Sequence, residues 1–398
     1  MKKAVGVICE FNPFHNGHMY FIRRIKEAFP EKAVVCVMSG NFVQRGSFAI
    51  QEKYSRAKCA LLYGADLVLE LPFPFSSLSA ESFAASAVSI LNGIGVVDTL
   101  AFGCECADTK ALVRCAENLA SEKFKEAFAS FTEKNRAVGY PAARSRVYAD
   151  LFGKTELLDQ PNAILGLEYL MAIKKENAPL SPFVIPRIGD TLRETVAESE
   201  YPSATAVRKM IFEGKEVTTY LPPEVNAVLK EEVQNGRFPV SMEYYAATLF
   251  YLLRTKSRKE LSAVYGLAPL YDRANKTAPS CKSLEDLVEK LRSVNFTDSR
   301  VRRALLSLLC GVSRFAEKEK PSYTMVLAAG EKGRELLSEM KDASEISVFT
   351  KPAHALKSKD KTILRQASLS YLADDLYAAA FPEKGENGEF LKKTPYIV

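Results

Sequence analysis

Short apolar runs alternate with amphipathic segments through the first half of the chain, and this alternation limits the fold more than any other feature. The runs are rich in β-branched residues, which is typical of buried strands, and they lie at residues 4–9, 33–39, 66–72, 97–103 and 183–189. Segments with helical spacing lie between them, at residues 17–29, 52–64, 79–93 and 162–175. Strands that alternate with helices form parallel sheets, so we predict an α/β domain whose sheet is covered on both faces.

The pattern changes after about residue 210. Helical segments follow one another at residues 221–233, 242–255, 284–294, 299–312 and 333–341, and the only strand-like run in this half lies at residues 346–350. A chain of 398 residues exceeds the usual size of a single core. We therefore predict two domains, an α/β domain over residues 1–210 and a mostly helical C-terminal domain over residues 211–398.

Composition indicates a soluble protein with an anionic partner. Apolar residues make up 47% of the chain and charged residues 26%, and no stretch reaches the run of about 18 uncharged apolar residues that spans a bilayer. The first residues turn polar too early for a signal peptide, so we expect no membrane association and a cytoplasmic location. The eight cysteines include no C-x-x-C pair, which favours small buried residues over bridges or zinc ligands. A net charge of +6 mildly favours an anionic partner.

The stretch "FNPFHNGH" (11–18) contains two of the three histidines, His15 and His18, where the first strand passes into the first helix. Free backbone N–H groups and the helix dipole at such a position attract an anion, and Gly17 lets a phosphate approach the backbone closely. Residues three apart can lean toward the same point. Loss of one hydrogen-bond donor to a developing charge costs about a hundredfold to a thousandfold in rate. We therefore predict that the two imidazoles bind and activate a phosphate.

Three other interpretations of the histidine pair compete with phosphate binding. Buried core histidines are disfavoured because the stretch is polar and rich in turn residues. A zinc site would need a third ligand, and the pattern H-E-x-x-H is absent, so we predict no metal site in the protein. Ordinary loop residues stay open as the third interpretation.

The stretch resembles the H-x-G-H signature of the nucleotidyltransferase superfamily, which also underlies class I aminoacyl-tRNA synthetases. A Rossmann-like fold is implied, in which the histidines contact ATP phosphates. The superfamily's second signature, a Ser/Thr-rich stretch that ends in arginine at a helix start, resembles "PSATAVRKM" (202–210), with Ser203, Thr205 and Arg208. The alternative for this stretch is a plain N-capped helix. The resemblance implies that His15, His18 and Arg208 are catalytic.

A closer resemblance covers more of the chain. Four stretches resemble, in order, the bacterial tRNA(Met) cytidine acetate ligase family, and they lie at residues 38–50, 64–84, 100–105 and 161–169. The likeness is dense over residues 5–210 and thinner beyond, where residues 295–309 and 328–337 still match. Phe48, Cys104 and Pro161 depart from the family pattern.

The family resemblance implies a set of ATP contacts. The first group follows the first strand: Val7, Ile8, Cys9, Glu10, Phe11, Asn12, Pro13, Phe14, His15, Asn16, Gly17, His18, Met19 and Tyr20. The second group lies further along the chain: Gly103, Asn162, Arg187 and Ile188. These contacts suit their residue types, because Gly103 ends a parallel strand, Asn162 offers an amide, and Arg187 offers a fork to phosphate oxygens. A turn glycine, a helix cap and a surface arginine are the alternatives.

The loop "SGNFVQRG" (39–46) follows the second strand and faces the same end of the sheet. We interpret it as a substrate loop that recognises an acyl group, a phosphate or an RNA base, and a surface turn is the alternative. The residues of this loop that we expect to contact substrate are Ser39, Gly40, Asn41, Gln44 and Arg45.

The resemblance implies a ligase that works in two steps. Acetate attacks the α-phosphate of ATP, with Mg²⁺ expected beside the phosphates, and the acetyl group then passes to N4 of the wobble cytidine of elongator tRNA(Met) without coenzyme A. The alternatives are a small-molecule adenylyltransferase and a non-catalytic regulator that binds ATP or RNA. We expect no obligate protein partner. The helical domain would hold the tRNA through basic residues: Arg300, Arg303, Lys351, Lys357, Lys359, Lys361 and Arg365.

Overall fold

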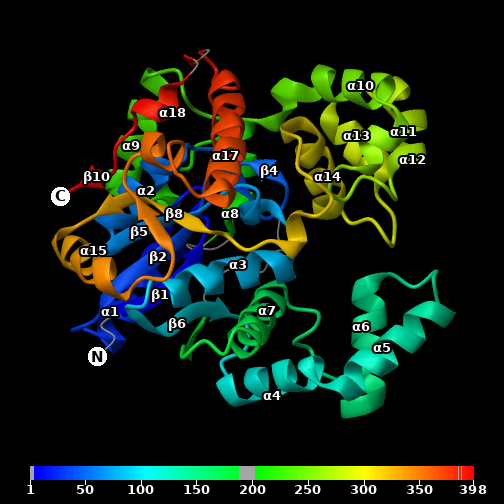
Figure 1. The fold of residues 1–398 in the computed structure, drawn as a ribbon, viewed down its shortest axis with the longest axis horizontal. Coiled ribbons are helices and arrows are strands. Elements are labelled where there is room, and N and C mark those ends of the chain that lie inside the picture. Colours follow the sequence, from blue (N-terminus) through cyan, green and yellow to red (C-terminus); the bar gives the residue numbers. More distant parts are fainter. Residues whose placement is uncertain (1–3, 188–201, 384, 387) are drawn as a thin grey trace.

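A computed structural model describes residues 4–187, 202–383, 385–386 and 388–398. Its centre is an eight-stranded sheet (Figure 1). The strands of this sheet are β1 Ala4–Cys9, β2 Ala33–Ser39, β5 Leu67–Leu71, β6 Val97–Cys104, β7 Ser181–Pro186, β8 Tyr323–Ala329, β9 Ser347–Phe349 and β10 Tyr396–Ile397. A small hairpin outside it pairs β3 Phe42–Val43 with β4 Ser47–Phe48.

Five strands of the sheet are parallel and lie in the order β5-β2-β1-β6-β7. This is the order of a Rossmann-like doubly wound sheet, and it reverses between β1 and β6. In such sheets ligands bind outside the carboxyl ends of the strands at the point of reversal. The predicted α/β fold is therefore confirmed, and the topology places a binding site at the ends of β1 and β6.

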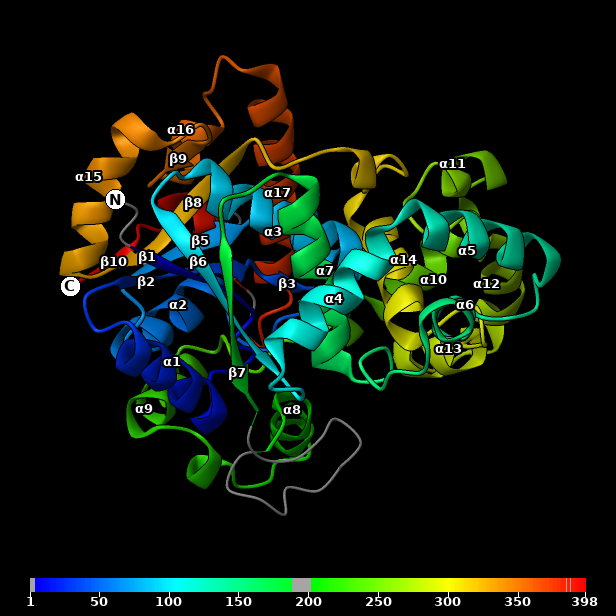
Figure 2. The ribbon, with the colours of Figure 1, turned by 90° about the horizontal axis from the view of Figure 1, so that it is seen from below.

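Helices cover both faces of the sheet (Figure 2). The first face carries α1 Asn16–Ala28, α2 Lys53–Leu62 and α9 Pro223–Gln234. The opposite face carries α3 Ala80–Gly93, α7 Pro161–Lys175 and α15 Glu331–Ala343. Helix α1 shows why the sequence folds this way, because Ile22 and Ile25 share its buried face while Arg23 and Arg24 are exposed on the other.

Two helical lobes extend from the sheet and face each other at one end of the molecule (Figure 1). The first lobe consists of α4 Thr109–Ala120, α5 Glu122–Lys134 and α6 Tyr140–Phe152. The second consists of α10 Ala246–Thr255, α11 Arg258–Ser262, α12 Tyr271–Thr277, α13 Leu284–Leu291 and α14 Asp298–Cys310. The remaining helices are α8 Ala204–Phe212, α16 Pro352–Ala355, α17 Lys361–Ala379 and α18 Glu389–Lys392. Short 3₁₀ helices lie at Phe75–Ser77, Thr218–Tyr220, Met242–Tyr245, Ala278–Ser280 and Ala316–Lys318.

The C-terminal part of the chain returns to the central sheet. The prediction of a single strand after residue 210 is wrong, because Tyr323–Ala329 also forms a strand, β8, which runs antiparallel to β5. All seven of its residues are buried, and without it β5 would present an open edge of unpaired backbone groups. Strand β10 then pairs with β8, so the last part of the chain packs with the first. The helical content of residues 204–310 agrees with the sequence, and the boundary at residue 210 stays a prediction.

A buried charge cluster attaches α17 to the sheet. The Lys53 ammonium lies 2.8 Å from a Glu70 carboxylate oxygen and 2.6 Å from one of Asp374. The Asn41 side-chain amide donates to the other Asp374 oxygen at 2.8 Å. Removal of one member would leave a buried charge unpaired, which is far more costly than loss of a surface pair. The cluster therefore fixes the end of β2 against α17.

Among the described residues, none of the helices is both long enough and apolar enough to cross a lipid bilayer. The expected cytoplasmic location stays a prediction.

Candidate active site

The candidate site lies where β1, β6 and β7 end. The chain leaves β1 through the turn at residues 10–15 and enters α1, while β6 ends at Gly103 and Cys104. Because these strands are parallel and neighbouring, their carboxyl ends meet at one edge. The predicted ATP segment from Val7 to Tyr20 therefore forms one continuous strand, turn and first helical turn at the reversal point.

His15 and His18 lie against each other at the start of α1. Their ring centroids are 3.8 Å apart, and the rings are stacked with an interplanar angle of 29°. The Nδ1 atom of His15 accepts from the Gly17 backbone N–H at 3.1 Å, and that of His18 accepts from the His15 N–H at 3.2 Å. A side chain at Gly17 would bring its Cβ to 2.9 Å from the His15 ring, so glycine is required here for the ring to take this position.

Both imidazoles are neutral in the free protein. Burial lowers the pKa of His15 to about 3, and the positive charges of Arg187 and Arg208 add to this effect. Burial also holds the pKa of His18 well below its usual range, with further contributions from His15 and Arg187. Since each Nδ1 accepts a hydrogen bond, the ring proton of each residue resides on Nε2. The pair thus offers two Nε2–H donors, for which we find no acceptor among the described residues.

Two phenylalanines fix the position of the His18 ring. The Phe11 and Phe14 centroids lie 5.0 and 5.6 Å from that of His18. Phe11 has a φ of 46°, a left-handed conformation that costs energy for a bulky residue and is often found at functional sites. His15 is only 5% exposed, whereas His18 is half-buried. The two histidines therefore form one side of the site and are held by packed aromatic rings, and His18 is the more accessible of the two.

Arg208 reaches this turn from a distant part of the chain. Its guanidinium donates to the Asn12 carbonyl oxygen at 2.7 Å and to Thr205 Oγ1 at 3.1 Å. Ser203 caps α8 by accepting from the Ala206 N–H at 3.2 Å. Burial lowers the pKa of Arg208 to about 10, so the side chain still carries its charge at neutral pH. The two predicted signatures lie at residues 11–18 and 202–210, at opposite ends of the predicted α/β domain in the sequence, and the fold brings them into contact.

Gly103, Asn162 and Arg187 also lie close together, and their contact with ATP stays a prediction. The Arg187 guanidinium donates to Asn162 Oδ1 at 3.4 Å, and a Cβ at Gly103 would touch the Arg187 side chain at 3.4 Å. Sequence reasoning missed Glu105, whose carboxylate accepts from the Asn162 backbone N–H at 3.2 Å, from the Asn162 amide at 2.6 Å and from the Ala163 N–H at 2.9 Å. Glu105 therefore holds Asn162 in place at the start of α7. Ile188 lies outside the described residues.

The predicted substrate loop divides into a buried part and an accessible part. Ser39, Gly40 and Asn41 are buried, and a Cβ at Gly40 would clash with the Glu70 carboxylate at 2.4 Å. These residues thus have structural partners within the protein. The other two residues of the loop are more accessible, since Gln44 is half-buried and Arg45 is exposed. Their role in substrate recognition stays a prediction.

Glu10 connects the substrate loop to the end of β1. Its carboxylate accepts from the Gln44 N–H at 2.7 Å and from Ser39 Oγ at 3.5 Å. Sequence reasoning also missed Arg56, a fully buried side chain that donates to the carbonyl oxygens of Glu10 at 2.5 Å, Ser39 at 3.1 Å and Gly40. Arg56 thus ties together the ends of β1 and β2, and only the fold brings these carbonyl groups to one side chain.

Comparison with known proteins is consistent with this geometry. The HIGH Nucleotidyl Transferase family matches residues 1–390. A tRNA(Met) cytidine acetate ligase of Thermosipho melanesiensis is 34% identical over 407 residues, which cover 96% of each chain. One of Acetivibrio thermocellus is 36% identical over 400 residues, which cover 95% of each. The chain belongs to the tRNA(Met) cytidine acetate ligase family.

Two crystal structures of a similar protein, TmcAL of Thermotoga maritima, extend the comparison. Apo TmcAL superposes with a TM-score of 0.92 at 30% identity and covers 100% of this chain and 99% of that one. TmcAL bound with alpha-thio ATP superposes with a TM-score of 0.90 at 30% identity and with the same 100% and 99% coverage. This chain therefore shares with TmcAL its Rossmann-like core and helical C-terminal region.

The positions that depart from the family pattern have structural roles. The ring of Phe48 packs against Tyr245 and Tyr377, with centroids 5.9 and 5.6 Å away. Cys104 is buried at the end of β6, and Pro161 is the first residue of α7, a position that suits proline. The three departures from the family pattern therefore leave the polar groups of the two histidines and of Arg208 unchanged.

The basic residues predicted to bind tRNA lie in two separate places. Arg300 and Arg303 are on α14, and the Arg303 guanidinium donates to the Gln44 carbonyl oxygen of the substrate loop at 3.3 Å. Lys357 and Lys359 are exposed in the segment between α16 and α17, which Figure 2 places far from α14. The other predicted contacts are also exposed: Lys351, Lys361 and Arg365. Of the two groups, the one on α14 is nearer to the site, because Arg303 contacts the substrate loop.

Proposed function

We propose that this protein is an ATP-dependent ligase that acetylates a cytidine of tRNA. A carboxylate oxygen of acetate attacks the α-phosphorus of ATP, and the bond to the β-phosphate breaks, which gives acetyl-adenylate and pyrophosphate. The N4 atom of the cytidine then attacks the acyl carbon and loses a proton, and AMP leaves. The products are N4-acetylcytidine, AMP and pyrophosphate, and coenzyme A is not required.

The observation that carries this proposal is the pair of neutral imidazoles with two Nε2–H donors beside Arg208. An attacked α-phosphate gains negative charge on its oxygens, and fixed donors aimed at that charge act more strongly on the transition state than on ATP itself. The named relatives are tRNA(Met) cytidine acetate ligases, and the similar TmcAL was crystallised with alpha-thio ATP. Acetate as the acid and elongator tRNA(Met) as the acceptor are part of our proposal.

The other residues of the site suit the remaining parts of ATP. Asn162 presents an amide that Glu105 and Arg187 orient, and it is suited to the base or ribose. Within the residues that the structure describes, no cluster of three or more His, Cys, Asp or Glu side chains is arranged to hold a metal ion. We therefore propose that Mg²⁺ enters on the triphosphate as part of the substrate.

The proposed second step needs a cytidine that has left its stack. A base in a single-stranded loop leaves its neighbours at lower cost than a paired base does. Gln44 and Arg45, next to Glu10, are the accessible residues that could face the incoming nucleotide. The mixed anhydride is already activated, so this step requires positioning more than further acid–base catalysis.

A nucleoside assay tests the proposed function directly. The protein is incubated with ATP, radiolabelled acetate and unmodified tRNA, and the RNA is digested and separated into nucleosides. We expect label in N4-acetylcytidine and a stoichiometric release of AMP and pyrophosphate. Pyrophosphate exchange that depends on a phosphorylated metabolite, and not on acetate, would instead identify a small-molecule adenylyltransferase.

A further inference from the structure

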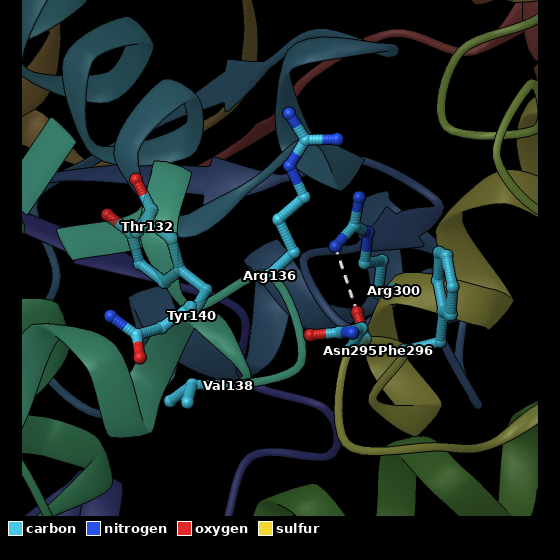
Figure 3. Close-up of a pocket in the computed structure, with 8 residues that line it drawn as sticks. Thr132, Arg136, Val138, Tyr140, Asn295, Phe296 and Arg300 are labelled. Atoms are coloured by element: carbon cyan, nitrogen blue, oxygen red, sulfur yellow. Dashed lines mark hydrogen bonds between the residues drawn. The ribbon is translucent and has the colours of Figure 1, made fainter. Parts of the chain in front are cut away.

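A cavity lies away from the histidine pair, between the two helical lobes. It is an open groove with a volume of about 380 Å³, bordered by the turn between α5 and α6 and by the segment that leads into α14 (Figure 3). Its principal lining residues are Arg136, Val138, Tyr140, Asn295, Phe296 and Arg300. We call this cavity the interlobe cleft.

The interlobe cleft combines exposed aromatic surface with uncompensated positive charge. Tyr140 is 56% exposed, which is unusual for a large aromatic side chain. The Arg300 guanidinium carbon lies 4.8 Å from the centre of the Phe296 ring. Within the described part of the chain, neither Arg136 nor Arg300 forms an ion pair with an acidic side chain. Figure 3 shows the Arg300 guanidinium between Tyr140 and Phe296, while the Arg136 side chain extends upward, beyond the two rings.

The two segments that border the cleft contact each other at one end. A Cβ at Gly139 would lie 2.5 Å from the Val294 carbonyl oxygen, so only glycine permits this approach. The Arg300 guanidinium donates to the Asn295 carbonyl oxygen at 2.9 Å, which holds the arginine over Phe296. The side-chain amide of Asn295 makes no hydrogen bond to the described residues and lines the cleft. The cleft is thus a preformed site with a free polar group.

A path of arginines connects the cleft to the candidate active site. Arg303 lies one turn after Arg300 on α14 and donates to the Gln44 carbonyl oxygen at 3.3 Å. Arg45 is the residue after Gln44. Burial has the largest effect on the pKa of Arg208, Glu10 the second largest, and the positive charge of Arg45 the third. A polyanion that passes from Arg208 along these side chains would therefore reach the interlobe cleft.

We propose that the interlobe cleft binds an unpaired nucleotide of the RNA whose cytidine is acetylated, and this inference rests on the proposed function. Tyr140 and Phe296 supply faces on which a base stacks, the Asn295 amide can bond to a base edge, and the two arginines neutralise the flanking phosphates. A base inside a duplex has no free face, so the cleft selects a single-stranded loop.

Four substitutions at the cleft test the assignment, each in the full-length protein. Tyr140→Ala and Phe296→Ala remove the stacking faces, and Arg136→Ala and Arg300→Ala remove the charges. Loss of one stacked base typically weakens binding by roughly 5- to 150-fold. We expect an increase of that order in KM for tRNA and in Kd for a fluorescent stem–loop RNA, with a smaller effect for a blunt duplex of the same strand length.

Matched surface variants serve as controls. Tyr251→Ala removes an aromatic residue that is 64% exposed on α10, and Arg146→Ala removes a paired arginine of α6, neither of which lines the cleft. Both should leave KM for tRNA within twofold of the wild-type value. Acetate-dependent pyrophosphate exchange, which needs no RNA, reports on the ATP site of each variant, and thermal unfolding reports on folding.

The outcomes separate this inference from the proposed function. If the wild-type protein acetylates tRNA and the four cleft variants, all folded, do so with unchanged KM, the assignment of the cleft is wrong while the proposed function stands. If the wild-type protein neither binds the stem–loop nor acetylates tRNA, the proposed function and the cleft assignment fail together. Equal loss of binding to the stem–loop and to the duplex would indicate general attraction to phosphate and would also overturn the assignment.

Discussion

The His18 Nδ1 atom accepts the backbone N–H of His15 at 3.2 Å, while the two imidazole rings stack 3.8 Å apart. His15, the N-cap of α1, and His18, in the first turn of that helix, therefore hold each other in place. Because the acceptor is Nδ1, the proton of the His18 ring is on Nε2 and can point into the site. The backbone of the first helical turn thus sets both the orientation and the tautomer of a proposed catalytic group.

Replacement of His18 separates its capping role from its chemical role. His18→Asn keeps a side-chain acceptor near the His15 N–H but removes the Nε2–H donor, whereas His18→Ala removes both. We expect acetate-dependent pyrophosphate exchange to fall by about a hundredfold to a thousandfold in both variants. Only His18→Ala should also lose stability, by about 1 kcal/mol, as for other lost N-terminal caps. Near-normal exchange in a folded His18→Asn protein would contradict the proposed role.

The neutral state of His15 predicts a specific response to acid. Its pKa is about 3 in the folded protein against 6.5 in an unfolded chain, so only the unfolded chain binds a proton between these values. The stability due to this residue is complete above pH 6.5 and is lost as the pH falls, by about 1.4 kcal/mol per pH unit. Chemical unfolding from pH 7 to 5 should therefore show a steeper loss for the wild type than for His15→Asn. Parallel curves would show that His15 is not kept neutral by the fold.

Glu105 is expected to act as a positioning residue for ATP. Its carboxylate holds both the backbone and the amide of Asn162, so Glu105→Ala should free that amide and raise KM for ATP by about tenfold, with little change in kcat. Asp108→Ala is the matched control, because Asp108 caps α4 by accepting from the Ala111 N–H at 3.0 Å, away from Asn162. Both variants should lose about 1 kcal/mol of stability. A similar KM in the two variants would rule out positioning by Glu105.

The Asn41 side chain is predicted to stabilise the whole fold. It donates to Asp374 Oδ1 at 2.8 Å and accepts from the Lys53 N–H at 2.9 Å, so Asn41→Ala leaves one carboxylate oxygen and one backbone N–H buried without these partners. We expect a loss of about 2–5 kcal/mol in the free energy of unfolding, measured in urea. Glu27→Ala, which breaks only surface pairs of α1, should change the same quantity by less than about 1 kcal/mol. Equal effects would show that the Asn41 contacts contribute little.

The sequence predicted what depends on local patterns. Strands β1, β2, β5, β6 and β7 were found because each is a short apolar run between helical segments, and the histidine pair because it follows the first of them. Strand β8 was missed because "YTMVLAA" lies in a part of the chain where helical segments follow one another, outside the alternation of strands and helices, and its pairing with β5 depends on contacts more than 250 residues away.

The residues of the site that were missed depend on tertiary contacts. Glu105 acts on a residue 57 positions further along the chain, and Arg56 on a carbonyl group 46 positions before it. No pattern in either neighbourhood indicates these partners. Conversely, Asn41 was predicted to contact substrate because its loop follows the second strand at the same end of the sheet, and only the fold shows that the amide of Asn41 donates to Asp374.

The link between Asn41 and Asp374 joins positions 333 residues apart in the chain. The N-terminal part of a chain leaves the ribosome first, so the segment after β2 emerges long before α17, which contains Asp374 and anchors that segment. Strand β8, which closes the edge of β5, also emerges late. The loop after β2 can therefore reach its final contacts only when translation is nearly complete, and a prematurely terminated chain would expose the open edge of β5 to aggregation.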